Sequence, residues 1–196
     1  MSAKLVVTEF ITLDGGVEDP GGSENFEHGG WNFEYDIGEG GGKFKMDELE
    51  SADAQLLGRV TFEGFAAAWP DREDTPGPEG EFAKKFNAMP KHVVSTTLTD
   101  PEWNNSSVIS GDVPEEIRKL KDQYDGDILV SGSVTLVKTL IENDLVDQWN
   151  LMFFPTLLGS GKRLFPEGVP RRNLKAVEEK TVGSDGVWTA IYERAD

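Results

Sequence analysis

The chain has no cysteine at all, which excludes disulfides, thiolate metal sites and cysteine nucleophiles. It has no run of 18 or more consecutive apolar residues, so we expect no membrane-spanning helix. Basic residues are scarce, with 19 Lys and Arg against 36 Asp and Glu, which leaves a net charge of −17. Because nucleic-acid affinity depends on neutralising phosphates with Lys and Arg, we expect no nucleic-acid partner.

Histidine is almost absent as well. His28 and His92 lie far apart in the sequence and have no acids at matching spacing, so no metal site is predicted. The N-terminus lacks the basic region, apolar stretch and small-residue cleavage site of a secretory signal, and we expect a cytoplasmic protein. A length of 196 residues predicts one domain over residues 1–196, large enough to bury a core.

What the chain does contain is an alternation of strand and helix patterns. Apolar periodicity predicts strands over residues 5–11, 54–57, 92–95, 107–109, 128–130 and 149–154, and helices over residues 43–52, 62–67, 81–87, 115–124 and 134–141. Two last strands, 174–181 and 187–193, flank a Gly-Ser-Asp-Gly turn and predict an antiparallel hairpin. This order favours an α/β fold whose sheet is mostly parallel and has an antiparallel edge.

Two segments are predicted to be loops. Residues 14–42 are rich in glycine and carry the aromatic residues Phe26, Trp31, Phe33 and Tyr35, whereas residues 70–80 are polar and rich in proline. A loop as long as the first tends to be functional, such as a lid, and four aromatics would be costly to leave in water. Trp31 and Phe33 could wall a planar heterocycle or could simply pin the loop.

The segment from residue 127 to 165 predicts a nucleotide site. The apolar strand at 128–130 turns through Ser131, Gly132 and Ser133 into a helix. A helix that begins directly after a strand leaves free backbone N–H groups at its positive end, and these groups suit a phosphate.

Two more strand ends carry polar residues that suit a phosphate. Gly58 ends one strand and is followed by Arg59 and Thr61, which could pair with a phosphate and donate a hydrogen bond to it. The alternative is that Thr61 caps the helix and that Arg59 lies on the surface. Ser95 and Thr96 follow another strand, where their hydroxyls could contact a ribose or phosphate or could cap a turn.

Five segments in this order resemble the dihydrofolate reductase-like family, in its branch related to the reductase domain of bacterial riboflavin biosynthesis. They span residues 12–15, 57–61, 92–95, 130–133 and 144–161. The resemblance implies a dihydrofolate reductase-like three-layer sandwich, an NADPH cofactor and a homodimer. It implies hydride transfer to a pterin- or pyrimidine-like heterocycle, as in 5-amino-6-(5-phosphoribosylamino)uracil reductase. The alternatives are a true dihydrofolate reductase and a non-catalytic nucleotide-binding homologue.

The resemblance also implies roles for the residues at these strand ends. It places Arg59 and Thr61 at the adenosine 2′-phosphate, with the hydroxyls of Ser95 and Thr96 beside them. It places the residues of the 131–133 turn under the pyrophosphate. The family usually has two adjacent glycines in this turn, whereas this chain has Ser-Gly-Ser. Serine keeps the backbone N–H but is restricted at positive φ.

On the substrate side the sequence leaves the proton donor open. Asp14 could lie near the nicotinamide as the catalytic residue, or it could form an Asx turn before Gly15. The acids of residues 34–48 are candidates without a fixed register, and the pair Glu48 and Glu50 is predicted to be solvated surface charge. The segment 149–158 is too apolar for an exposed edge strand, which suggests either a homodimer or burial within the chain.

Overall fold

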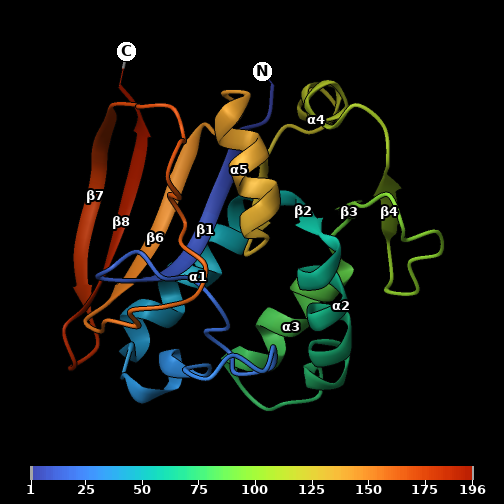
Figure 1. Cartoon of the computed structure of the whole chain (residues 1–196). Helices are drawn as coiled ribbons and strands as arrows, with labels where there is room; N and C mark the ends of the chain where they lie inside the picture. The colour runs from blue at the N-terminus through green and yellow to red at the C-terminus, as the bar shows by residue number, and fades with distance from the viewer. Residues whose placement is uncertain (1, 196) are drawn as a thin grey trace.

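The computed structural model describes residues 2–195 and shows an eight-stranded sheet between two layers of helices (Figure 1). The strands lie in the order β4-β3-β2-β5-β1-β6-β8-β7. Their bounds are β1 Leu5–Thr12, β2 Ala52–Gly58, β3 Lys91–Val94, β4 Ser106–Ile109, β5 Asp127–Ser131, β6 Gln148–Phe154, β7 Leu174–Val182 and β8 Val187–Arg194. Strands β1 to β6 pair in parallel, and β8 is antiparallel to both of its neighbours, β6 and β7. The predicted α/β fold with an antiparallel C-terminal hairpin is confirmed.

The helices cover both faces of the sheet. They are α1 Gly38–Ser51, α2 Arg59–Ala68, α3 Pro78–Ala88, α4 Val113–Lys121 and α5 Val134–Glu142, with short 3-10 turns at η1 Trp31–Glu34 and η2 Pro70–Arg72. One apolar core joins the sheet to α4 and α5, and a second joins it to α1, α2 and α3. In β1, Leu5 and Val7 face the first core and Val6 faces the second. Because the central strands are buried on both faces, their sequences are almost continuously apolar.

Helix α1 begins at Gly38, inside the segment that was predicted to be a loop. The glycines that suggested a loop are required by close packing instead. A Cβ on Gly40 would lie 3.2 Å from Cγ1 of Val182 in β7, and a Cβ on Gly38 would lie 3.0 Å from the Cα of Gly183 in the β7–β8 turn. The glycine-rich start of α1 therefore lets the helix pack closely against the C-terminal hairpin.

Strand β6 lies inside the sheet, paired with β1 on one side and with β8 on the other. Its apolar residues, among them Trp149, Leu151 and Phe154, are buried within the chain. Burial inside the sheet explains why this segment is too apolar for an edge. The homodimer stays a prediction, and the hydrophobicity of β6 no longer argues for it. No helix within residues 2–195 is long and apolar enough to cross a membrane.

Candidate active site

The carboxyl ends of the parallel strands open into a cleft with a volume of about 2340 Å³. Residues at the ends of β2 and β5, in the middle of β1, on α1 and in the first turns of α2 and α5 line it. Ligands of open α/β sheets bind at this end of the strands. The cleft contains eight of the residues predicted for the site: Phe33, Arg59, Thr61, Ser95, Thr96, Ser131, Gly132 and Ser133.

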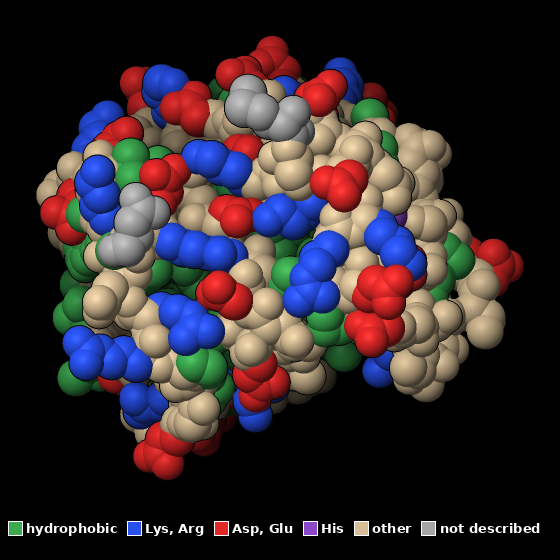
Figure 2. Space-filling model, turned by 90° about the horizontal axis from the view of Figure 1, so that it is seen from above, with side chains coloured by type: hydrophobic (Ala, Val, Ile, Leu, Met, Phe, Trp, Pro, Cys, Tyr) green, Lys and Arg blue, Asp and Glu red, His purple; other side chains and the backbone are tan. Residues whose placement is uncertain are grey.

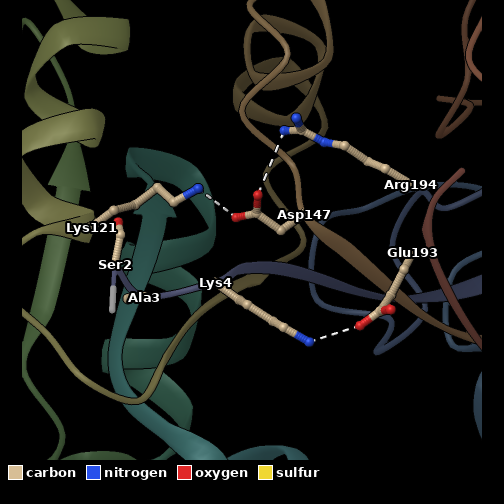
Figure 3. Close-up of a pocket in the computed structure, with 7 residues that line it drawn as sticks. All are labelled: Ser2, Ala3, Lys4, Lys121, Asp147, Glu193 and Arg194. Carbon is tan, nitrogen blue, oxygen red and sulfur yellow. Dashed lines mark hydrogen bonds and ion pairs between the residues drawn. The ribbon is translucent and has the colours of Figure 1, made fainter. Parts of the chain in front are cut away.

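The opposite end of the sheet has a smaller hollow of about 400 Å³, near the two termini. Figure 2 looks onto this end and shows many Lys and Arg side chains there. Those in the hollow are paired with acids, as Figure 3 shows: Lys121 lies 2.5 Å and Arg194 3.6 Å from the Asp147 carboxylate, and Lys4 lies 2.7 Å from Glu193. These ion pairs tie α4 and β8 to the residues just before β1 and β6, so we assign the hollow a structural role.

The turn after β5 is joined to the turn after β2 by two hydrogen bonds. The backbone N–H of Ser133 donates to the Thr61 hydroxyl at 3.1 Å, and the backbone N–H of Gly58 donates to the Ser133 hydroxyl at 2.8 Å. Gly132 and Ser133 both have positive φ, +60° and +64°. Serine thus adopts the left-handed conformation that the family's glycine would take. This conformation is unfavourable for a residue with a Cβ. The Ser133 hydroxyl, which glycine lacks, joins the two turns by accepting from Gly58.

Both helices that follow these turns begin at the cleft without a side-chain cap. The N-cap of α2 is Gly58 and that of α5 is Ser133, and neither accepts a capping hydrogen bond through its side chain. The first-turn N–H groups of an uncapped helix lack partners within the helix, and the helix dipole makes this end positive. The alternative interpretation of Thr61 as an N-cap is wrong, because its hydroxyl accepts from Ser133 across the site. The arrangement suits an anionic group that bridges two helices.

The Arg59 guanidinium lies in the first turn of α2, where it lines the cleft. Its Nη1 donates to both carboxylate oxygens of Glu63, at 2.9 and 2.8 Å. The Arg59 side chain is 42% exposed, so this ion pair is open to exchange with a phosphate. Lys91, the first residue of β3, cannot serve in this way because it is fully buried and donates to three backbone carbonyls.

The hydroxyls after β3 have different environments. Ser95 is buried, and its Oγ accepts from the backbone N–H groups of Thr97 and Leu98 at 3.1 and 3.0 Å. This is the turn-capping role that the sequence left open. Thr96 is exposed and lines the cleft.

Asp14 lies outside the residues that line the cleft. Its carboxylate accepts from the Thr12 hydroxyl at 2.6 Å and from the backbone N–H groups of Leu158 and Gly159. The hydrogen bond from Thr12, with further help from Gly159 and Leu158, lowers the pKa of Asp14 to about 2. An acid that is ionised at neutral pH and engaged in this way is no proton donor, so the geometry argues against the catalytic alternative. The predicted Asx turn is wrong as well, because the carboxylate accepts from the loop after β6 and the N–H of Gly16 donates to Thr12 instead.

Trp31 and Phe33, the two aromatic residues predicted to line a heterocycle site, have different environments. Trp31 is 2% exposed, packs edge-on against Phe154 and donates from Nε1 to the Glu18 carbonyl at 2.9 Å. It pins the loop and does not line the cleft. Phe33 is 76% exposed and does line the cleft. Of the two, only Phe33 is placed to contact a ligand there.

Four polar residues lie together at the β1–α1 end of the cleft, and of these only Glu48 was named from the sequence, both as a candidate acid and as surface charge. The Thr8 hydroxyl donates to Glu48 at 2.8 Å, and the Lys45 ammonium contacts both, at 2.6 Å each. Glu48 is buried, so its assignment to solvated surface charge is wrong, whereas Glu50 is exposed as predicted. Glu9, the fourth, is 5% exposed and lines the cleft. Glu9 could have been identified from the sequence, because it is a charged residue inside an otherwise apolar strand.

Together, the sheet order and the position of the cleft define a dihydrofolate reductase-like α/β protein. The chain belongs to the RibD C-terminal domain family, which matches residues 3–188. It is 32% identical to YyaP of Bacillus subtilis (strain 168) over 189 residues, which cover 96% of this chain and 94% of YyaP. The family is reductase-like.

Solved structures share the fold at low identity. A Shewanella sp. PV-4 protein named for riboflavin biosynthesis superposes with a TM-score of 0.69 at 19% identity, with full coverage of both chains. Dihydrofolate reductase from Enterococcus faecalis, complexed with NADP(H), gives a TM-score of 0.61 at 18% identity, again with full coverage. The Thermotoga maritima deaminase and 5-amino-6-(5-phosphoribosylamino)uracil reductase gives 0.60 at 15% identity, over 99% of this chain and 57% of that one.

Proposed function

We propose that the protein is an NADPH-dependent reductase that transfers a hydride to a pterin- or pyrimidine-like heterocycle. The observation that carries this proposal is the meeting of two uncapped helix N-termini, those of α2 and α5, at one end of the cleft. Membership of a reductase-like family supports the same class of reaction.

The residues at this end fit the phosphates of a dinucleotide. The N–H groups in the first turns of α2 and α5 would hold the pyrophosphate, which could approach closely at Gly132 because that residue has no side chain. Arg59 would hold the 2′-phosphate of NADPH after leaving Glu63, with Thr96 beside it. The bound cofactor supplies the hydride. The protein binds and orients both reactants and excludes water from the space between them.

The other end of the cleft fits a flat ring. Phe10 and Phe154 pack edge-to-face there with centroids 5.4 Å apart, and Tyr35 packs against Phe154 at 5.8 Å. Phe10, Tyr35 and exposed Phe33 line the cleft, while Phe154 is fully buried and supports Phe10 and Tyr35. Aromatic walls of this kind bury a planar ligand at a low cost in side-chain entropy.

Two other functions use the same fold. A true dihydrofolate reductase would reduce dihydrofolate with NADPH, whereas a non-catalytic homologue would bind nucleotide and reduce nothing. The joined turns at Ser133 and the exchangeable pair at Arg59 favour a working NADPH site over a degenerate scaffold, which has no need of either.

The first test is cofactor preference. Trp69 lines the cleft, so energy transfer from tryptophan to the reduced nicotinamide reports binding of NADPH and NADH. We expect Arg59→Ala to weaken the binding of NADPH about tenfold, or roughly 1.4 kcal/mol. The affinity for NADH should stay almost unchanged, since only NADPH has the 2′-phosphate. Glu63→Gln removes the carboxylate that pairs with Arg59, so it should tighten the binding of NADPH.

Lys43→Ala is the matched control. Lys43 also lines the cleft and also forms an ion pair four residues along its helix, with Asp47. Its removal should change neither affinity. If Arg59→Ala lowered the affinities for NADPH and NADH equally, the role of Arg59 would be contradicted. Failure of the wild-type protein to bind either cofactor would refute the reductase function itself.

A further inference from the structure

We propose that the β1–α1 end of the cleft binds a planar heterocycle that carries no phosphate and whose ring edge hydrogen-bonds to Glu9. The proposal rests on the reductase function and narrows its substrate class. It separates this chain from the phosphoribosyl substrate in the name of the Thermotoga maritima neighbour.

Glu9 is the first observation. Its side chain lines the cleft, yet its Oε1 is buried and has no hydrogen-bond partner among residues 2–195. The neighbouring position on β6 is Leu151, which offers no polar group. A buried polar atom without a partner costs free energy in a folded protein unless a ligand satisfies it.

The protonation state of Glu9 determines which ligand groups it can satisfy. Burial raises the pKa of Glu9 to about 8, the Lys45 ammonium acts to lower it, and the carboxylates of Glu24 and Glu48 raise it further. Lys45 is itself bonded to Glu48 and to Thr8. At neutral pH most Glu9 carboxyls therefore carry a proton, and the group can donate one hydrogen bond and accept another. A ring nitrogen next to an N–H or amino group offers the complementary pair.

The charge of this end is the second observation. Helix α1 brings Lys43 and Lys45 to the cleft, and both are engaged, at 2.5 Å from Asp47 and 2.6 Å from Glu48. Lys162, on the loop after β6, is 2.9 Å from Glu18. The cleft is also lined there by the exposed acids Glu39 and Glu50.

A phosphate at this end would have to displace a lysine from its partner and would still face carboxylates. The opposite end differs in its helix N-termini. Helices α2 and α5 begin there with no acid in their first turns, whereas α1 begins at this end with Glu39 in its first turn and with the Gly38 N–H bonded to Asp36. The cleft is therefore electrostatically asymmetric, with one end that suits the cofactor's phosphates and another that rejects a phosphorylated substrate.

The test compares two ligands that differ only by a phosphate: 6-hydroxymethylpterin and its phosphate ester, titrated at pH 6.5 by pterin fluorescence. We expect the unphosphorylated pterin to bind at least tenfold more tightly. Raising the salt concentration should narrow the gap, because screening weakens the repulsion of the ester. Equal or tighter binding of the ester, or binding of neither ligand, would overturn the proposal.

Different variants test the charge of this end and the role of Glu9 separately. Glu39→Lys combined with Glu50→Lys should reduce the discrimination against the ester, whereas Glu167→Lys, on an exposed loop outside the cleft, should not. Carbon-13 NMR of labelled glutamate should show one carboxyl that titrates near pH 8 and is absent from Glu9→Gln. A protein without that signal would contradict the role of Glu9.

Binding of NADP⁺ to the same samples distinguishes failure of this inference from failure of the proposed function. If NADP⁺ binds and the two pterins bind equally, the substrate inference is wrong and the cofactor site stands. If the pterin discrimination is found and NADP⁺ does not bind, the reductase function is wrong and the heterocycle site stands.

Discussion

Asp14 shows how a single carboxylate can resemble a catalytic group in sequence and act as a structural one. It follows the first strand, where a nicotinamide could lie, but its oxygens are taken up by Thr12, Leu158 and Gly159. These hydrogen bonds join the turn after β1 to the loop after β6, so the ionised carboxylate holds two segments that are distant in the sequence.

Asp14→Asn should therefore lower stability and leave NADPH affinity unchanged. The pKa of Asp14 is lowered from 3.8 to about 2, so its ionised form stabilises the folded state above pH 3.8, and this stabilisation is lost as the pH falls through 2. We expect a loss of about 1–2 kcal/mol in the free energy of unfolding at pH 7, which shrinks as the pH approaches 2. Urea denaturation at several pH values measures it.

Asp125→Asn is the control for this charge change, since Asp125 is exposed. It should leave the free energy of unfolding within about 0.5 kcal/mol of the wild-type value. A stable Asp14→Asn protein with a large loss of turnover and unchanged cofactor binding would instead restore the catalytic role for Asp14.

At the scale of elements, Ser133 joins two strand–turn–helix units. Its hydroxyl accepts from Gly58 at the end of β2, while its own φ of +64° is unfavourable for a residue with a Cβ. Ser133→Ala keeps the backbone cost and loses the hydrogen bond, so we expect about 1–2 kcal/mol of destabilisation. Ser133→Gly loses the same bond but relieves the strain, and should cost less.

Thermal or urea unfolding of the three proteins measures this order. Thr135→Ala, in the first turn of the same helix, serves as the control and should stay within about 0.5 kcal/mol of wild type. Should Ser133→Gly prove as destabilised as Ser133→Ala, backbone strain at this position would be negligible and the hydrogen bond alone would account for the loss.

The order of elements could be predicted from the sequence because strands buried on both faces leave continuous apolar runs, as at 128–130. The phosphate turns could be predicted because each is local: Gly58 to Thr61, and Ser131 to Ser133. The start of helix α1, before the predicted residues 43–52, could not, since Gly38 is explained by contact with Gly183, far along the chain. The burial of Glu48 could not be predicted either, because it depends on a hydrogen bond from Thr8, a residue 40 positions away.

At the scale of the whole molecule, the charge is unevenly distributed. Lys and Arg side chains are numerous on the end of the molecule seen in Figure 2, where those of the hollow are paired with acids. Among the residues that line the cleft, acidic side chains outnumber basic ones. The net charge of −17 therefore adds to an unfavourable field at the cleft, and an anionic cofactor approaches against it.

This field predicts that NADPH associates faster as the ionic strength rises. The screening length falls to about 10 Å at 0.1 M salt, which weakens long-range repulsion before it affects contacts within the site. Stopped-flow fluorescence from about 0.01 to 0.2 M NaCl should show a rising association rate constant for both wild type and Arg59→Ala. An uncharged osmolyte at matched osmolarity should have no such effect. A rate constant that falls with salt would mean that local attraction by Arg59 and the helix N-termini dominates the approach as well as the bound state, and in that case Arg59→Ala alone should reverse the trend.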